Sequence, residues 1–371
     1  MNYLIKEAID ILKRPRNYLK LPNIFFVILS YYLCKISKRN IVLGHPFMMM
    51  LEPTNICNLR CPLCITGSNL MTREDGVMEL ENFRKLMDES GKHLVHLTLW
   101  SQGEPFVNRH FTEMVQIAKN KGIKTMTSTN GHFLVENADK IVESGLDVLI
   151  VAMDGASQET YEKYRVNGRF GKVYNGMKAV AEAKKRHKSK TPEIELQFIV
   201  MKHNEHETEK IRALAYECGA QVISFKTAQV YTQDQADEFL PVQEKYRRYE
   251  LDSKGGIKTK SKEINFCRWI LLCPVINWDG TVSPCCFDKN AEYGLGNVFT
   301  EGGMKKIWKS GAYAKFRKQI YKQRKKIPIC SNCSEGLEVE VFEKEKVTKT
   351  FIKAENVAVI KKESMPKSRV A

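Results

Sequence analysis

Apolar and polar positions follow two different periods through the middle of the chain. Short runs of apolar and β-branched residues have the length of buried strands, and the segments between them place apolar residues at helical spacing. We predict six strands, at residues 47–52, 94–100, 124–129, 148–153, 194–201 and 222–228. We predict helices between them, at residues 79–90, 109–121, 134–144, 173–187 and 205–218.

Strands that alternate with helices indicate parallel βα units. Such units place functional loops at the C-terminal ends of the strands, in an open sheet and in a barrel alike. In the last predicted helix, Cys218 shares one face with Ile211, Leu214 and Ala215. We therefore expect this cysteine in the core and not as a metal ligand.

Residues 1–46 form a leader with a basic stretch at 13–20 and an apolar run at 24–33. That run is shorter than the roughly 20 apolar residues needed to span a bilayer. We expect a helix that is buried or docked on the protein. The alternative is a helix lying in a membrane interface, with Tyr31, Tyr32 and lysines at its edge and peripheral membrane contact through residues 24–33.

Composition is that of a globular protein, with 371 residues, 43% hydrophobic and 27% charged. The net charge of +16 favours anionic partners. No compact basic stripe interleaved with aromatic residues occurs, so we prefer a lysine-rich solubilising surface and do not favour nucleic acid as a partner.

Eleven cysteines are many for a chain that shows no secretory signal. The first 20 residues contain Glu7 and Asp10, and no small-residue cleavage site follows the apolar run. We expect a cytoplasmic protein, with membrane association through the leader left open. In a reducing compartment, clustered cysteines are typical of metal ligands or catalytic groups.

The first cysteine group, CNLRCPLC at residues 57–64, directly follows the first strand. A helical cysteine stripe is disfavoured because the residue before a proline avoids the helical region, which puts Cys61 in a loop or turn. A zinc site would need a fourth ligand, and the nearest downstream histidines, His93 and His96, lie a strand away. Three thiolates with one place open indicate a reactive iron–sulfur cluster.

This loop resembles the C-x3-C-x2-C signature of the radical S-adenosylmethionine (SAM) superfamily, which follows the first strand of a partial (βα)6 TIM-like barrel. The resemblance covers residues 47–230 and implies that Cys57, Cys61 and Cys64 bind three irons of a [4Fe–4S] cluster whose fourth iron binds SAM. It implies reductive cleavage of SAM to a 5′-deoxyadenosyl radical that abstracts a substrate hydrogen. A reduced flavodoxin or ferredoxin-type protein would donate the electron.

Three further elements resemble the SAM-binding motifs of the same family. SQGEP at 101–105 resembles "GGEP" and implies that Glu104 binds the SAM ammonium group. TNG at 129–131 resembles the turn that would make Asn130 a SAM contact. MDG at 153–155 resembles "SxDG" and implies a role for Asp154, although Ala152 stands at the serine position, so that hydroxyl contact is missing.

Arg165, in YEKYR at 161–165, resembles the arginine that helps to hold SAM. Its guanidinium could pair bidentately with the methionine carboxylate. An exposed helix arginine is the alternative.

The second cysteine group lies in the C-terminal third. Residues 278–281 predict a tight hairpin with Asp-Gly at its turn, and CSNC at 330–333 forms a knuckle with two possible ligands. Spacing alone leaves zinc and a [4Fe–4S] cluster both open. The group comprises Cys267, Cys273, Cys285, Cys286, Cys330 and Cys333.

The stretch from Cys267 through NWDGTVSPCCFD, LGNV, IW and CSNC resembles the SPASM or twitch auxiliary-cluster extension of radical SAM enzymes. The resemblance implies one auxiliary [4Fe–4S] cluster, because the longer seven-cysteine pattern is absent. Cys286 is the alternative to Cys285, since neighbouring strand residues point to opposite faces. The implied ligands are Cys267, Cys285, Cys330 and Cys333.

Cys273 belongs to no obvious ligand set. We prefer a small apolar strand residue. The alternative is a thiol hydrogen donor that quenches a substrate radical.

We therefore predict an α/β radical SAM enzyme that oxidises, epimerises or cross-links a peptide or a small molecule such as a sugar, aminocyclitol or lipid precursor. Residues 1–46 are too short for the winged-helix domain that many peptide maturases carry. A non-catalytic iron–sulfur or zinc protein and an RNA-modifying enzyme are the alternatives. The predicted units are the leader (1–46), the barrel core (47–235), a small cysteine-rich hairpin and helix domain (236–336) and a charged extension (337–371).

Overall fold

The computed structural model describes residues 14–251, 256–260, 265–333 and 342–351. Six parallel strands pair in sequence order, β1 beside β2 and so on to β6. All six strands predicted from the sequence are present, with ends that differ by at most two residues. Their bounds are β1 Met48–Leu51, β2 His96–Thr98, β3 Lys124–Thr129, β4 Val148–Ala152, β5 Glu193–Val200 and β6 Val222–Thr227.

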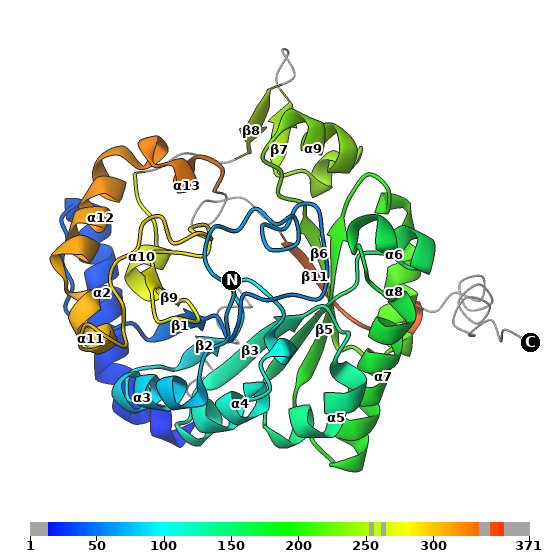
Figure 1. Ribbon diagram of the computed structural model, residues 1–371, viewed down its shortest axis with the longest axis horizontal. Helices are drawn as coiled ribbons and strands as arrows, with labels where there is room; N and C mark the ends of the chain where they lie inside the picture. Colours follow the sequence, from blue (N-terminus) through cyan, green and yellow to red (C-terminus); the bar gives the residue numbers. More distant parts are fainter. Residues whose placement is uncertain (1–13, 252–255, 261–264, 334–341, 352–371) are drawn as a thin grey trace, which may run out of the picture.

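Helices cover the outer face of this curved sheet, as in a partial barrel (Figure 1). The helix α5 shows why they pack there, because it buries Leu134, Ala138, Ile141 and Val142 along one stripe at helical spacing. The five predicted helices are present, and a short α6 was not predicted. Their bounds are α3 Leu80–Ser90, α4 Phe111–Asn120, α5 Leu134–Glu143, α6 Gln158–Tyr164, α7 Phe170–Arg186 and α8 Thr208–Glu217.

The predicted C-terminal hairpin forms, and it extends the barrel sheet. β9 (Val275–Ile276) pairs antiparallel with β10 (Val282–Ser283) and parallel with β1. The backbone N–H groups of Met50 and Glu52 donate to this hairpin strand, to Pro274 and Ile276 respectively. Short helices complete the region, namely α10 Trp269–Leu272, α11 Gly303–Trp308, α12 Gly311–Gln323 and α13 Pro328–Ser331.

Two segments outside the barrel core contain further regular structure. The polar stretch 231–265 holds α9 (Gln233–Phe239) and an antiparallel pair, β7 (Tyr249–Leu251) and β8 (Ile257–Thr259). In the C-terminal extension, β11 (Phe342–Lys346) pairs antiparallel with β6 and closes the other sheet edge. The rest of the charged extension, 352–371, lies outside the described residues. The 3-10 segments are η1 Pro15–Lys20, η2 Pro105–Val107, η3 Glu205–Glu207, η4 Glu244–Tyr246, η5 Arg324–Lys326 and η6 Lys349–Phe351.

The leader forms η1 and the helix α2 (Leu21–Ser37), which dock on the fold. Arg14 donates to Asp147 at 2.6 Å, and the buried Lys20 ammonium donates to the carbonyls of Leu94 and Lys121 at 2.6 and 3.0 Å. The helix α2 therefore docks on the fold, as the preferred prediction of a buried or docked helix required. The apolar segment is longer than expected, because Pro15–Ser37 has 23 residues and by length and composition alone could cross a membrane.

Candidate metal centres

The first cysteine group lies in the loop that leaves the C-terminal end of β1. Cys61 is buried, and Cys57 and Cys64 are half-buried. Burial raises the pKa of the Cys61 thiol to about 11, and Cys64 and Cys57 add to that rise. Because the Cys61 thiol feels the charges of both Cys57 and Cys64, the three sulfurs lie near one another. The prediction that this loop gathers three sulfurs at a strand end fits the structure.

In the described residues, no three His, Cys, Asp or Glu side chains are close enough together to hold a single metal ion. A zinc ion binds sulfur at about 2.3 Å and draws its ligands tightly together. A four-iron cube is larger, and its thiolate ligands stand farther apart. Both groups offer cysteine sulfur, the donor that holds iron–sulfur clusters.

Glu104, 1% exposed, lies at the end of β2 and faces the end of β3. Its Oε1 accepts from Phe106 N–H and the Thr129 hydroxyl, at 3.3 and 2.7 Å, and its Oε2 accepts from Asn130 N–H at 2.7 Å. A carboxylate offers about four acceptor positions, so one remains open for a cationic donor. Burial raises the pKa of Glu104 to about 7, against the lowering effect of these donors.

Asn130 joins the β3 end to the cysteine loop. Its Nδ2 donates to Asn58 at 2.8 Å and approaches the Cys57 sulfur at 3.8 Å. The next residue, Gly131, has φ of +83°, and an added Cβ would lie 2.7 Å from Val173. The turn therefore requires glycine there.

Asp154 and Arg165 form a buried ion pair beside the cluster loop. Asp154 Oδ2 accepts from Arg165 Nε at 2.6 Å, and Arg165 Nη1 lies 3.8 Å from the Cys61 sulfur. Burial lowers the pKa of Arg165, but the charges of Asp154 and Cys61 outweigh that effect and hold it well above the usual range. The Arg165 side chain is only 13% exposed, so the alternative of an exposed helix arginine is wrong.

Three cysteines of the second group, Cys267, Cys330 and Cys333, lie near Arg324. Burial raises the pKa of Cys285 well above the usual range, and among its neighbours Cys267 and Cys333 raise it further. Cys330 interacts with Cys267 and forms a hydrogen bond with Arg324. Burial lowers the pKa of Arg324, but the charges of the thiols raise it overall. A buried cation beside three sulfurs, those of Cys267, Cys330 and Cys333, is a feature that the sequence did not predict.

Cys273 lies near that set, since its charge and those of Cys285 and Cys267 all raise the pKa of Tyr313. Its thiol is 7% exposed, and burial raises its pKa to about 12, with Cys286 as the neighbouring charge that adds to the rise. It precedes β9, whereas the cluster loop leaves the opposite, C-terminal end of the neighbouring β1. These surroundings are those of a small core residue.

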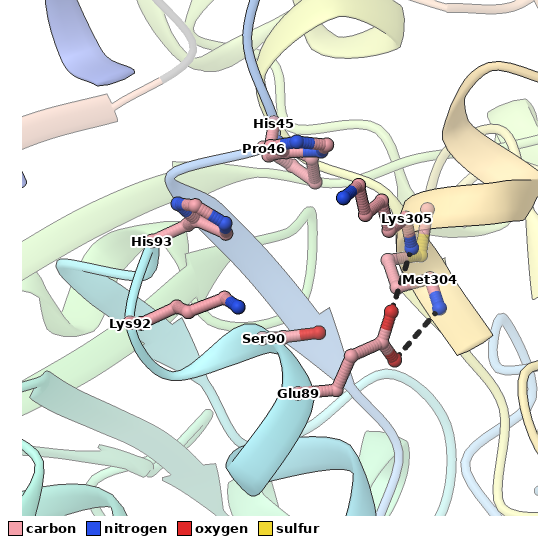
Figure 2. Close-up of a pocket in the computed structure, with 8 residues that line it drawn as sticks. All are labelled: His45, Pro46, Glu89, Ser90, Lys92, His93, Met304 and Lys305. Carbon is pink, nitrogen blue, oxygen red and sulfur yellow. Dashed lines mark hydrogen bonds between the residues drawn. The ribbon is translucent and has the colours of Figure 1, made fainter. Parts of the chain in front are cut away.

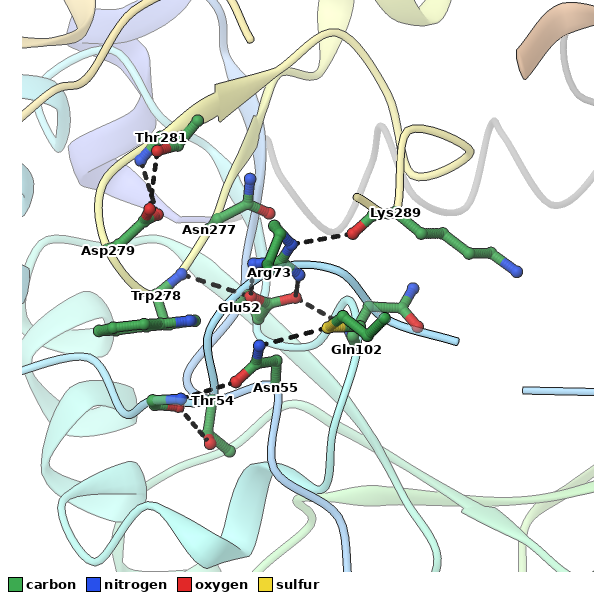
Figure 3. Close-up of polar contacts among 12 residues, drawn as sticks. Glu52, Thr54, Asn55, Arg73, Gln102, Asn277, Trp278, Asp279, Thr281 and Lys289 are labelled. Atoms are coloured by element: carbon green, nitrogen blue, oxygen red, sulfur yellow. Dashed lines mark hydrogen bonds and ion pairs between the residues drawn. The ribbon is translucent and has the colours of Figure 1, made fainter. Parts of the chain in front are cut away.

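A buried ion pair ties the two cysteine regions together (Figure 3). Arg73 donates from Nη1 and Nη2 to the two oxygens of Glu52, both at 2.9 Å, and from Nε to the Lys289 carbonyl at 2.9 Å. The N–H groups of Gln102 and Trp278 also donate to Glu52. One carboxylate thus links the ends of β1 and β2, the cysteine loop and the C-terminal hairpin. The only sequence signal for it is a charged residue at the end of an apolar strand.

A small pocket lies at the opposite, N-terminal edge of the strands (Figure 2). His45 and His93 stack there with ring centroids 4.6 Å apart, and Lys92 and Lys305 line the same pocket. Glu89 accepts from the N–H groups at the start of α11. Because this pocket precedes β1 and β2, it lies away from the strand ends that carry the cysteine loop and Glu104.

Comparison with known proteins matches both regions. Residues 51–215 match the radical SAM superfamily model, and residues 267–334 match the SPASM iron–sulfur cluster-binding domain. The chain is 25% identical over 320 residues to the tungsten-containing aldehyde ferredoxin oxidoreductase cofactor-modifying protein of Pyrococcus furiosus, over 77% of this chain and 86% of that protein. It is 23% identical over 289 residues to mycofactocin maturase MftC of Mycobacterium tuberculosis, over 73% of this chain and 72% of the maturase.

Among solved structures, SuiB of Streptococcus suis bound to S-adenosylmethionine has the same fold, with a TM-score of 0.56 at 15% identity over 81% of this chain and 73% of SuiB. The two domain matches cover the two cysteine groups in the predicted order. They imply iron–sulfur clusters and SAM as cofactors. The chain belongs to the radical SAM superfamily, as an enzyme that carries a SPASM-type auxiliary-cluster domain.

Proposed function

We propose that this enzyme modifies a peptide substrate by radical chemistry at the C-terminal edge of the barrel. The observation that carries the proposal is the convergence of Cys57, Cys61, Cys64, Glu104 and Arg165 on that edge. The reduced cluster, when bound, supplies the electron that cleaves SAM and so generates the radical that removes a substrate hydrogen. We assign this chemistry to residues 47–235 and the auxiliary cluster to residues 236–336.

The chain's own residues bind and orient the cofactor. Glu104 accepts the SAM ammonium group at its one open acceptor position, and Asn130 keeps the adjoining turn against the cysteine loop. Arg165 offers Nη1 beside Cys61, where it can meet the methionine carboxylate. Asp154 occupies the Nε side of the same guanidinium and acts by holding Arg165 in place.

The auxiliary cluster is held by Cys267, Cys285, Cys330 and Cys333. We choose Cys285 as the ligand because its thiol feels the charges of Cys267 and Cys333, two of the other proposed ligands. We propose Cys273 as a core residue. Full turnover by Cys273→Ala supports that role, and loss of product with SAM cleavage intact would instead make it a hydrogen donor.

Peptide is the preferred substrate class because of the relatives. Mycofactocin maturase and SuiB, which has been solved with its precursor peptide SuiA, resemble this chain over most of its length. We further propose a reduced flavodoxin or ferredoxin-type electron donor. Residues 24–33 would make peripheral contact with a membrane.

The experiment is anaerobic reconstitution followed by reduction in the presence of SAM. We expect 5′-deoxyadenosine from the wild-type enzyme and none from Cys57→Ala, with Cys34→Ala as the control for a cysteine outside both groups. Hydrogen transfer from a labelled precursor peptide would then identify the substrate class. An enzyme that makes no 5′-deoxyadenosine with a full iron complement refutes the function. Hydrogen transfer from a small molecule and not from the peptide would refute the proposed substrate class.

A further inference from the structure

The outward face of α2 is apolar along its whole length. Nine of the fifteen large apolar side chains that are exposed in the described parts of the chain lie on this helix and the turn before it. Phe25 is 61% exposed and Ile36 is 81% exposed. No charged residue occurs between Lys20 and Lys35. Exposed apolar patches of this extent mark interaction surfaces. The nine are Tyr18, Leu19, Leu21, Phe25, Phe26, Ile28, Tyr32, Leu33 and Ile36.

The inward face of the same helix carries the polar contacts. Ser30 Oγ accepts from Leu43 N–H at 2.9 Å, and Asn23 exchanges two hydrogen bonds with the backbone of His45 at 2.8 and 3.0 Å. A surface helix of a globular protein ordinarily turns its apolar face inward. Here Val27 and Cys34 are buried on the inward face, and the outward face is apolar as well. Because Lys20 and these residues fasten α2 along the fold, a membrane would meet the helix sideways and would not be spanned by it.

Basic residues flank this apolar face. Residues 302–333 contain eight lysines and no aspartate or glutamate, and all eight lysines are exposed. Seven lie on α11, α12 and η5, and Lys309 lies between α11 and α12. Both α11 and α12 share one edge of the molecule with α2 (Figure 1). Phe266 packs edge-to-face on Tyr31 of α2 and stacks on Tyr321 of α12, with ring centroids 5.3 and 6.0 Å apart, so the two helices are neighbours. The lysines are Lys305, Lys306, Lys309, Lys315, Lys318, Lys322, Lys325 and Lys326.

The pocket in Figure 2 continues the basic region to the start of α2. Lys92 and Lys305 line it, and His45, which Asn23 of α2 holds, forms part of its wall. Basic residues therefore lie beside the apolar face of α2 and near the start of that helix.

We propose that this docking face, defined as the nine apolar side chains with the eight lysines of residues 302–333, binds the surface of an anionic lipid bilayer. Apolar side chains enter the headgroup boundary while lysines meet the anionic lipids, and the two contributions add. A symmetric dimer through the same face would bring two lysine-rich regions toward each other, which their like charges disfavour. The inference extends the proposed membrane contact, names its lipid class and is independent of the radical chemistry.

Flotation with vesicles tests the proposal on the full-length, cluster-loaded enzyme. We expect binding to phosphatidylcholine vesicles that contain phosphatidylglycerol, little binding to phosphatidylcholine alone, and weaker binding as salt rises. Phe25→Ser/Phe26→Ser should weaken binding at least about tenfold. Lys315→Gln/Lys318→Gln/Lys322→Gln should weaken it by about fivefold for each lysine that reaches the surface. The matched control, Val135→Ser/Val242→Ser, removes two exposed apolar side chains elsewhere and should change nothing.

Several outcomes would overturn the docking face. The first is that the wild type fails to float with anionic vesicles. The second is that both variants bind the vesicles as well as the wild type does. The third is that the wild type forms a dimer instead of binding lipid, and the phenylalanine variant abolishes that dimer. Retention in the membrane after alkaline extraction would show a spanning helix. Formation of 5′-deoxyadenosine, measured on the same samples, separates the two proposals. An enzyme that cleaves SAM but does not bind the vesicles refutes only the docking face. An enzyme that binds the vesicles but does not cleave SAM refutes only the radical function.

Discussion

Removing the arginine of the Glu52–Arg73 pair should destabilise the whole enzyme. Glu52 has no exposed surface, and the Arg73 side chain is 10% exposed. Arg73→Gln would leave a buried carboxylate with only two backbone donors, from Gln102 and Trp278. Breaking a buried pair from one side costs about 3–5 kcal/mol, because the remaining charge is uncompensated. We expect the free energy of unfolding to fall by about that amount, or by less if the two backbone N–H groups still stabilise the Glu52 carboxylate through hydrogen bonds.

Urea unfolding of the anaerobic, cluster-loaded protein measures the effect, and a double-mutant cycle isolates it. Glu52→Gln/Arg73→Gln should be more stable than Arg73→Gln, because it removes the orphaned charge. The matched control is Lys85→Gln, which breaks an exposed pair with Glu81 whose side chains are 70% and 69% accessible. That change should cost no more than about 0.5 kcal/mol.

The reasoning fails if Arg73→Gln unfolds within about 1 kcal/mol of the wild type while Glu52 stays ionised. It also fails if the double variant is no more stable than Arg73→Gln. Either result would mean that Glu52 gains enough from its backbone donors alone. Iron content must be measured on each variant, because a lost cluster would lower stability through a different route.

Three further predictions concern the cofactor sites. The SAM affinity of the wild type, measured by equilibrium dialysis, should fall as pH drops through about 7. Burial places the pKa of Glu104 there, and only the ionised carboxylate attracts the ammonium group of SAM. The Glu104→Gln variant should bind SAM weakly and with little pH dependence. Cys285→Ala should lose the iron of the auxiliary cluster while Cys286→Ala keeps it, and equal iron contents would contradict the ligand choice. Arg324→Gln should lower the auxiliary cluster's reduction potential by roughly tens of millivolts in an electrochemical titration, because a nearby cation favours the added electron; an unchanged or higher potential would contradict this.

The barrel was predictable because its elements follow strong local patterns. The strand at 148–152 buries all five of its residues and contains only apolar side chains, so its run stands out in the sequence. The helix α6 was missed because QETYEKY is short and polar, with no apolar stripe to detect. Its Ser157 cap, which accepts from Thr160 N–H, is a weak signal on its own.

The residues predicted for the candidate site lie near one another in the structure, but their contacts with one another could not be predicted from the sequence. Glu104 and Asn130 are 26 residues apart, and nothing local indicates that one accepts from the other. Arg165 was open between a ligand role and an exposed helix position until Asp154 was seen to pair with it. Arg324 had no signal, because a basic stretch before a cysteine knuckle is typical of a solvated surface.

The pairing of β9 with β1 explains why the two cysteine groups need not be treated as separate modules. β1 leads directly into the loop of Cys57, and β9 belongs to the hairpin that leads to Cys285. Two adjacent strands in one hydrogen-bonded sheet cannot shift by a residue without reversing their side chains. The Glu52–Arg73 pair adds a second link above the same strands. Sheet register and this ion pair together therefore hold the loop that carries Cys57 in a fixed position relative to the hairpin that leads to Cys285.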